Sequence, residues 1–336
     1  EKNYSTVYAG KDLIERFKGT TPSDLLKGMS NVYSGDARNS GAVDPNIRGI
    51  QGPGRIALTV DGTEQSLAAW RGYNGVSNRN YIDPILIGGM QVIKGPNQVR
   101  DVKSGIGGAV AVNTLSASDI VKEGESWGGE IKLEGSNNTI KERLSPSYDG
   151  RDYRDVVEEL GLPGWTSQQR QDPILYKPLR SSSSNDFLNM EDQAARIALA
   201  TRQDNFELLG AYAWRERGNY FSGKKGSAFY DKEGDPGFYD FVPMMARIYK
   251  PGDEVPNTSS RMESWLLKGK WNISDEQEIS AGYRDSQHTY GEIMPSRISW
   301  SDTTQAGETI VPQWPLSTID IKAYNLDYKY TPAENR

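Results

Sequence analysis

Cysteine is absent from this chain of 336 residues, and histidine occurs once, as His288. Without cysteine the chain has no disulfide and no thiolate metal site. A single imidazole cannot assemble a histidine-based catalytic triad or a histidine-rich metal site. Carboxylate pairs are frequent, but none lies where one partner would become an acid and the other a base. The sequence therefore predicts neither an enzyme nor a bound metal, and His288 is expected to be an ordinary residue on the polar face of a strand.

Long hydrophobic runs are also missing. No segment approaches the roughly 20 apolar residues of a membrane helix, which excludes a helical membrane protein. Hydrophobic residues make up 36% of the chain, yet it carries 18 Tyr and 8 Trp. This composition is typical of an outer-membrane barrel, in which every second strand residue faces lipid, although a large soluble β protein also fits it. The net charge of −6 and the absence of a basic stripe predict no nucleic-acid partner. The chain opens without a basic and apolar leader, so we expect a processed or truncated form.

The segment from Asn46 to Leu115 combines short alternating strands with glycine turns, and it predicts a small compact sheet. Within it, residues 52–57 have the spacing of a dinucleotide-binding fingerprint. That fingerprint must close a strand and open a helix, whereas the residues after Arg55 alternate as a strand. The nucleotide interpretation is therefore rejected.

Residues 67–83 are too polar and too rich in glycine for a core strand, and they predict a loop with the composition of a binding surface. The alternative is a solvated loop that a few aromatic side chains pack down. The candidate ligand-binding residues are Trp70, Arg71, Tyr73, Asn74, Asn78, Arg79 and Tyr81.

From Trp127 onward apolar and polar residues alternate with a period of two, which predicts strands with two different faces. The connections between these strands alternate strictly in length. Long connections at one end and tight turns at the other are the signature of an outer-membrane barrel, with the long loops outside the cell. The expected strands are 127–136, 192–202, 206–215, 261–273, 278–288 and 319–330, and the expected extracellular loops are 139–190, 218–259 and 290–317.

Four motifs resemble the TonB-dependent outer-membrane receptors in order and spacing. They are Asn46-Ile47-Arg48-Gly49, Val60-Asp61-Gly62, Val92-Ile93-Lys94-Gly95-Pro96 and the glycine-rich segment 105–112. The resemblance implies a plug domain, a small α+β unit, inside a transmembrane antiparallel β-barrel of 22 strands. We expect the plug domain at residues 1–124 and the first part of the barrel, with about six strands, at 125–336. It also implies the outer membrane of a Gram-negative bacterium, contact with outer-membrane lipid, and a longer protein whose TonB-binding segment precedes the plug.

Within that family, residues 46–51, 81–83, 115–119 and 324–334 look most like receptors for haem that work with haemophores or haemoproteins. That subgroup places a haem-ligating histidine in the apical loop of the plug. The corresponding residues here, Arg71 to Gly75, contain no histidine, and Tyr73 lies nearest to that position. A tyrosinate is able to ligate haem iron. A ferric siderophore is the alternative ligand.

The resemblance implies active import, with the TonB complex pulling on the plug and no resident cofactor in this chain. The ligand, haem or a ferric siderophore, would bind between the apical plug loop and the outer loops. Polar pairing would hold the plug yet let it rearrange. A passive pore, an adhesin and a secreted β enzyme are the alternatives from other classes. The predicted plug–barrel pairs join Arg48, Arg55 and Lys94 to Glu130, Glu134 and Glu207.

Overall fold

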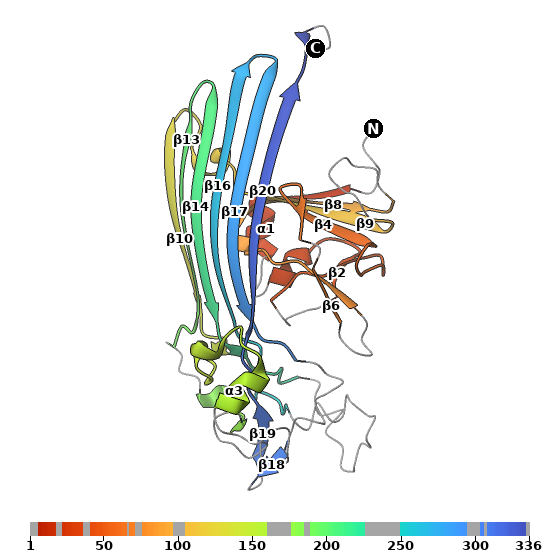
Figure 1. The fold of residues 1–336 in the computed structure, drawn as a ribbon, viewed down its shortest axis with the longest axis vertical. Helices are drawn as coiled ribbons and strands as arrows, with labels where there is room; N and C mark the ends of the chain where they lie inside the picture. The colour runs from red at the N-terminus through yellow and green to blue at the C-terminus, as the bar shows by residue number, and fades with distance from the viewer. Residues whose placement is uncertain are drawn as a thin grey trace.

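The computed structural model of the chain describes residues 6–17, 22–35, 41–65, 67–70, 76–96, 105–159, 176–184, 189–225, 249–293, 303–305 and 308–333. Its long strands form a curved six-stranded sheet, which we call the wall, and the segment before them forms a compact unit beside it (Figure 1). We call that unit, described residues 6–121, the plug unit. Among the described residues, no helix combines the length and the apolar character needed to cross a membrane.

The wall is antiparallel throughout, with the strand order β10-β13-β14-β16-β17-β20. Tight turns join β13 to β14 and β16 to β17 at one end, and long connections leave the other end (Figure 1). The strands are β10 (Trp127–Ser136), β13 (Asp192–Arg202), β14 (Phe206–Arg217), β16 (Ser260–Ser274), β17 (Gln277–Tyr290) and β20 (Ser317–Tyr330).

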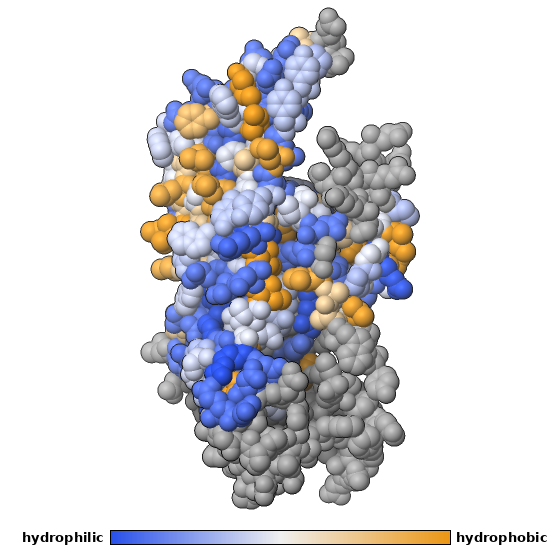
Figure 2. Space-filling view, in the orientation of Figure 1, coloured by the Kyte–Doolittle hydropathy of each residue, from blue (hydrophilic) through white to orange (hydrophobic). Residues whose placement is uncertain are grey.

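The two faces of the wall differ because side chains alternate along each strand. One face packs against the plug unit, and the other exposes large apolar side chains such as Leu133, which is 76% exposed. These side chains gather along the wall in Figure 2. Tyr212, toward the long connections, donates a hydrogen bond to Glu263 at 2.9 Å, and Tyr283, at the level of Leu267, donates to Asp285 at 3.0 Å. An apolar band bordered by aromatic rings is the pattern of a membrane-facing barrel surface.

The plug unit is built on a five-stranded mixed sheet with the order β1-β8-β9-β4-β5. Two hairpins, β2–β3 and β6–β7, extend from it, and short helices cover it. The strands are β1 (Thr6–Gly10), β2 (Val32–Ser34), β3 (Pro45–Ile47), β4 (Ile56–Val60), β5 (Thr63–Glu64), β6 (Leu67–Trp70), β7 (Val76–Arg79), β8 (Ile87–Lys94) and β9 (Gly108–Thr114). The helices are α1 (Lys11–Phe17), η1 (Pro22–Leu26), η3 (Pro84–Leu86) and α2 (Ala117–Ile120).

The recognised motifs form turns that this sheet requires. Asp61 and Gly62 both have positive φ, 49° and 80°, and reverse the chain between β4 and β5. The Asp61 carboxylate accepts hydrogen bonds from the backbone N–H and the hydroxyl of Thr114, at 2.9 and 2.5 Å. Gly108 has φ of 136°, and a Cβ there would lie 2.2 Å from the carbonyl oxygen of Ile93. These motifs therefore supply the positive φ angles and the close backbone approach that the mixed sheet requires.

The long connections pair with one another at their end of the wall. Strand β11 (Thr139–Ile140) pairs with β15 (Asn219–Tyr220), which joins the first long connection to the second. Strand β12 (Tyr176–Pro178) pairs with β19 (Glu308–Pro312), which joins the first to the third. The remaining elements are β18 (Thr303–Gln305), η4 (Pro146–Tyr148), α3 (Tyr153–Glu159) and η6 (Ser182–Ser184).

The predicted fold class, a small α+β plug with a sheet of long antiparallel strands, is confirmed. Each of the six predicted wall segments coincides with an observed strand to within a few residues at either end. The division of the chain at residue 124, and the extracellular position of the three long connections, stay predictions.

Candidate functional site

The hairpin β6–β7 carries the predicted ligand-binding residues and extends from the plug unit toward the long connections (Figure 1). Arg71, Tyr73 and Asn74 fall between β6 and β7 in the sequence and are outside the described residues, and the side chain of Trp70 is not described either. Their contact with a ligand stays a prediction.

Three other candidates, Asn78, Arg79 and Tyr81, are buried at the base of this hairpin. The Asn78 amide donates to the carbonyl oxygen of Ile56, at 3.1 Å, which fastens β7 to the central sheet. The side chain of Gln65 forms two 2.7 Å hydrogen bonds with the backbone of Tyr81. The contacts that the structure gives these residues are internal, so they position the hairpin. A direct role for them in ligand binding stays a prediction.

Tyr81 packs on two aromatic side chains of β17. Its ring centroid lies 5.5 Å from that of His288 and 5.2 Å from that of Tyr290, which is stacked on it. Burial raises the pKa of Tyr81, and the neighbouring Tyr290 raises it further. Tyr81 is therefore a neutral phenol in this position, and it contributes packing rather than charge.

Arg79 extends this cluster to the third long connection. It forms a very short ion pair with Glu292, lies 5.8 Å from the ring centroid of Tyr290 and donates to the Tyr290 hydroxyl at 3.5 Å. Burial alone would lower the pKa of Arg79, but the hydrogen bond and charge of Glu292 raise it overall. The cation is thus held charged between the base of the hairpin and the wall, and it couples the hairpin to the connection that follows β17. We call Arg79, Tyr81, His288, Tyr290 and Glu292 the β17 cluster.

Ion pairs tie the plug unit to β10 and β14. Lys11 pairs with Glu130 at 3.5 Å, and Arg215 pairs with Asp83 at 3.1 Å and with Glu134 at 3.2 Å. Asp83 is 1% exposed, so its pair with Arg215 is shielded from water. Charged groups of both signs therefore hold the plug on this side, and the Arg215–Asp83 pair does so away from water.

Three of the six residues predicted to pair plug and wall are carboxylates of the wall, and the structure gives their partners. Glu130 and Glu134 face the plug, where their observed cations include Lys11, Arg196, Lys132 and Arg215. Glu207 pairs with Arg202 across the β13–β14 hairpin at 3.1 Å. The pairing of these carboxylates with Arg48, Arg55 and Lys94 stays a prediction.

An apolar contact lies beside the ion pairs. Residues of η3 and α2 in the plug unit form one buried cluster with the plug-facing side chains of β13, β14 and β16. The guanidinium of Arg196 on β13 donates to the carbonyl oxygen of Ile85, at 2.5 Å. The cluster consists of Ile85, Leu86, Leu115, Ala117, Ile120, Val121, Ala194, Ala198, Ala200, Leu209, Ala211, Ala213 and Leu266.

A cavity of about 870 Å³ separates the plug unit from another part of the wall. Its plug side includes Asp61 and Ser116, and its wall side includes Arg202, Lys268 and Tyr324, so it reaches from the β13–β14 turn to β20. Lys268 spans the cavity edge, 3.6 Å from the Asp61 carboxylate and 3.3 Å from the carbonyl oxygen of Thr114. This polar space lies toward the tight-turn half of the wall.

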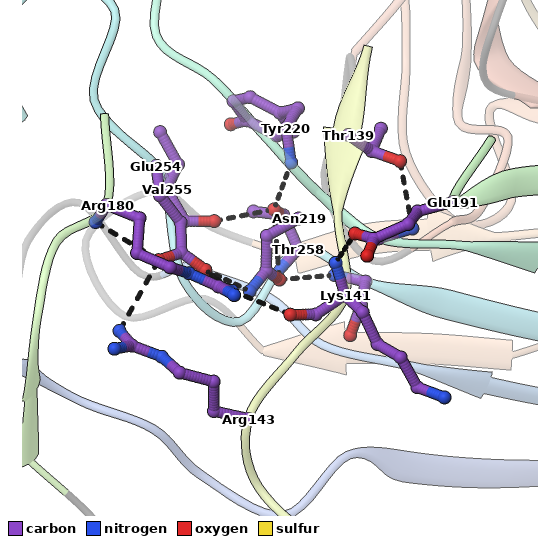
Figure 3. A network of polar contacts seen from close by, with 12 residues as sticks. Thr139, Lys141, Arg143, Arg180, Glu191, Asn219, Tyr220, Glu254, Val255 and Thr258 are labelled. Atoms are coloured by element: carbon purple, nitrogen blue, oxygen red, sulfur yellow. Dashed lines mark hydrogen bonds and ion pairs between the residues drawn. The ribbon is translucent and has the colours of Figure 1, made fainter. Parts of the chain in front are cut away.

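The long connections are held together by Glu254, whose side chain is 1% exposed (Figure 3). Arg180 donates to its two oxygens at 2.9 and 2.6 Å, and Asn219 donates at 3.0 Å. Arg143 lies 3.4 Å away. Burial by itself would raise the pKa of Glu254, but these hydrogen bonds and charges outweigh it and lower the pKa. The carboxylate is therefore ionised, and it joins the first long connection to the second.

Further contacts extend this network. Arg180 also donates to the carbonyl oxygen of Lys141 at 2.6 Å, and Asn219 accepts from the backbone N–H of Ser259 at 2.9 Å. In the third connection, the backbone N–H of Trp314 donates to the side chain of Asn257 at 2.9 Å. The described parts of the three connections therefore form one interconnected body at the end of the wall. Sequence reasoning missed this body, and also Lys11 and Arg215 as partners across the interface. No local pattern marks these residues, because their partners are distant in the chain.

Comparison with known proteins agrees with this architecture. Residues 2–109 match the family described as TonB-dependent Receptor Plug Domain. The chain is 55% identical over 337 residues to the Hemophilin receptor of Acinetobacter baumannii, an alignment that covers 100% of this chain and 31% of that protein. It is 30% identical over 146 residues to the Heme/hemopexin utilization protein C of Haemophilus influenzae, covering 42% of this chain and 19% of that protein.

Among solved structures, the chain resembles a double mutant of the Serratia marcescens hemophore receptor HasR in complex with its hemophore HasA and heme. The TM-score is 0.61 at 19% identity, covering 99% of this chain and 36% of that one. At this identity the likeness shows the fold alone. The chain spans about a third of the length of the Hemophilin receptor.

Proposed function

Because this chain belongs to the TonB-dependent receptors, we propose that the complete protein imports haem across the outer membrane of a Gram-negative bacterium. The observation that carries the proposal is the 55% identity to the Hemophilin receptor, which extends over the whole chain. The named haem utilisation relative supports the same ligand. Import, rather than chemistry on the ligand, is the activity, and haem is the cargo.

The proposal assigns different work to the two parts of the chain. Residues 1–124 form the plug, and residues 125–336 form the first part of the barrel, with the connections 139–190, 218–259 and 290–317 outside the cell. The apolar outer face of the wall, with Tyr212 toward its border at the long connections, contacts lipid. Energy comes from the inner-membrane TonB complex, which pulls on the plug.

Haem would first meet the outer connections and the tip of the β6–β7 hairpin. The network around Glu254 supports a preformed platform there, since buried charge pairs fix the two longest connections relative to each other. Such a platform suits the docking of a haem-carrying protein, that is, a haemophore or a haemoprotein. Tyr73, which falls between β6 and β7 in the sequence, is the proposed ligand to the iron, because a tyrosinate can bind ferric haem.

The test is an absorbance titration of the full-length receptor in detergent with haem and, separately, with ferric siderophores. Haem is expected to give a saturable shift of its Soret band, and the siderophores none. The substitution Tyr73→Phe is expected to shift the band or to weaken binding about tenfold or more, since an iron ligand is lost. Tyr33→Phe is the matched control, because Tyr33 is another plug tyrosine and is 60% exposed.

A saturable response to a siderophore, with none to haem, would replace haem by a ferric siderophore as the cargo. An unchanged spectrum and affinity in Tyr73→Phe would remove Tyr73 from the site but leave haem import standing. Uptake that persists without TonB would instead indicate a passive pore, and binding without uptake an adhesin.

A further inference from the structure

The β6–β7 hairpin, which carries the predicted ligand-binding residues, is a two-stranded sheet of its own. Its backbone pairs run from Leu67 with Arg79 to Trp70 with Val76. In the part of the chain that the structure describes, it shares no backbone ladder with the five-stranded plug sheet. A hairpin without further strands is only marginally stable in water. The contacts at its base therefore decide how well the ligand-binding residues are ordered.

Gln65 closes this base. The register of the hairpin, continued by two residues beyond the pair of Leu67 with Arg79, places Gln65 opposite Tyr81. Here a side chain takes the part of a strand backbone. The Gln65 amide nitrogen donates to the carbonyl oxygen of Tyr81, and its amide oxygen accepts from the Tyr81 N–H, both at 2.7 Å. One side chain thus supplies the donor and the acceptor of one ladder pair.

The backbone of Tyr81 requires such a partner. Tyr81 is 1% exposed, and a buried N–H or C=O without a hydrogen bond is unfavourable. Glutamine meets the need because its amide carries both a donor and an acceptor, on a side chain long enough to reach across the hairpin. By fixing the backbone of Tyr81, Gln65 also fixes the ring that packs on His288 and Tyr290.

Two buried asparagines hold the β7 end of the hairpin. The Asn80 amide donates to the carbonyl oxygen of Val43 at 3.0 Å, and the backbones of these two residues form a bridge. The Asn78 amide donates to Ile56, as described above. Gln65 differs from both, because it precedes β6 and bonds to the residue that follows β7. It therefore ties the entry of the hairpin to its exit.

We propose that Gln65 is a positioning residue for the cargo: its side-chain amide closes the β6–β7 hairpin and holds the ligand-binding residues in their binding arrangement. This inference rests on the proposed import of haem, and it names a residue outside the predicted ligand-binding set. A closed base limits the arrangements of the hairpin before the ligand arrives, so less order has to be gained on binding. Loss of the Gln65 hydrogen bonds frays the base and weakens binding.

Three substitutions in the full-length receptor separate reach from chemistry. Gln65→Asn keeps the amide but is one methylene shorter, and Gln65→Met keeps the length but has no amide. Gln65→Glu keeps the acceptor for the Tyr81 N–H and loses the donor to the Tyr81 carbonyl oxygen. The matched control is Gln193→Ala, since the Gln193 amide also donates to a backbone carbonyl oxygen, that of Met190 at 2.8 Å, but lies on the wall.

The first test measures the position of the hairpin without ligand. Spin labels are attached to Val76→Cys, at an exposed position on β7, and to Gln287→Cys, at an exposed position on β17, after any cysteines elsewhere are replaced by serine. Double electron–electron resonance gives the distribution of distances between the labels. Gln65→Asn and Gln65→Met are expected to widen it about twofold or more, and Gln65→Glu less.

Gln193→Ala is expected to leave this distribution unchanged. An unchanged distribution in both Gln65→Asn and Gln65→Met would overturn the proposal, whatever their affinity for haem.

The second test is an absorbance titration with haem. The affinity of the folded receptor is expected to fall about tenfold in Gln65→Asn and Gln65→Met, about threefold in Gln65→Glu, and less than about twofold in Gln193→Ala. Heat-modifiable mobility on gels measures the folded fraction. A role in plug stability alone would lower that fraction and leave the affinity and the Soret band of the folded receptor unchanged, and this result would also overturn the proposal.

The two tests separate this inference from the proposed cargo. A receptor with native Gln65 that binds no haem would disprove haem as the cargo. The distance measurement would still decide whether Gln65 holds the hairpin, since it is made without ligand.

Discussion

The ring of Tyr81 in the plug unit covers the imidazole of His288 on β17, with 5.5 Å between the ring centroids. The contact joins a residue just after the ligand-binding hairpin to a strand of the wall. It contributes close packing, but it leaves the histidine nitrogens without partners among the described residues. The contact therefore couples the position of the hairpin to the wall through ring packing, and no hydrogen bond joins the two side chains.

The Arg79–Glu292 pair should set the position of the hairpin tip. Glu292→Gln removes the negative charge of this pair, and it leaves the buried Arg79 cation without its anionic partner. We expect haem affinity to fall about tenfold, corresponding to about 1.4 kcal/mol. Titration of the full-length receptor with haem measures this affinity. Asp320→Asn, an exposed carboxylate of β20, is the matched control, and an equal loss there would argue against a specific role for Glu292.

The shielded pair between Arg215 and Asp83 should stabilise the seat of the plug. Asp83→Asn removes the buried negative charge that pairs with the Arg215 cation. Removing one partner of a buried ion pair typically lowers the free energy of unfolding by about 3–5 kcal/mol. Chemical denaturation of the refolded receptor checks this. Glu207→Gln breaks the exposed pair with Arg202 and should cost no more than about 1 kcal/mol. Similar costs for the two substitutions would contradict the assignment.

Gly108 should be irreplaceable even by alanine. Its φ of 136° disfavours any side chain, and the added Cβ would lie 2.2 Å from a backbone oxygen that cannot move freely. We expect Gly108→Ala to abolish folded receptor in the outer membrane, read by heat-modifiable mobility on gels. Gly210→Ala is the control, since its Cβ would meet no atom within 4 Å and its φ is unstrained. Normal folding of Gly108→Ala would show that the tight approach of β8 and β9 is dispensable.

The network around Glu254 should weaken in acid. The pKa of Glu254 is lowered in the folded protein, so its contribution to stability is fully present above the pKa of the unfolded chain, about 4.3. That contribution is lost as the pH falls further, through the folded pKa. Amide hydrogen exchange at residues 219 and 254–259, followed from pH 6 downward with correction for intrinsic rates, should therefore accelerate only below about pH 4.

Glu254→Gln should show faster exchange already at neutral pH, since the charge that gathers Arg180 and Arg143 is absent. Glu123→Gln, at an exposed site before the wall, provides the comparison. Exchange rates that do not differ between the two variants would remove Glu254 from its proposed position as the centre of the platform.

A charged substitution on the outer face of the wall should destabilise the receptor strongly only where that face meets lipid. Leu267→Arg places a cation within the apolar band, where such substitutions cost about 2–4 kcal/mol near the membrane centre. Gln287→Arg lies on the same face near the long connections and should cost at most about 1 kcal/mol. Unfolding from vesicles measures both, and equal costs would be inconsistent with a lipid boundary between the two positions.

The sequence by itself determined the wall strands and the turns of the plug. Alternation with a period of two fixes which residues share a face, so the strand from Phe206 could be read without knowing its neighbours. The turn at Asp61-Gly62 was equally local, because positive φ restricts which residues can occupy it. These features depend on backbone geometry over a few residues.

Only the tertiary structure decided which charges and rings meet across the interface. With 39 basic and 45 acidic residues, the chain offers many complementary pairs, and charge alone does not select Lys11 for Glu130 or Arg180 for Glu254. Tyr81 was expected at a binding surface, yet it lies buried against His288, more than 200 residues further along. Such contacts follow from strand register and from how the plug sits in the wall, and both are set by packing over the whole fold.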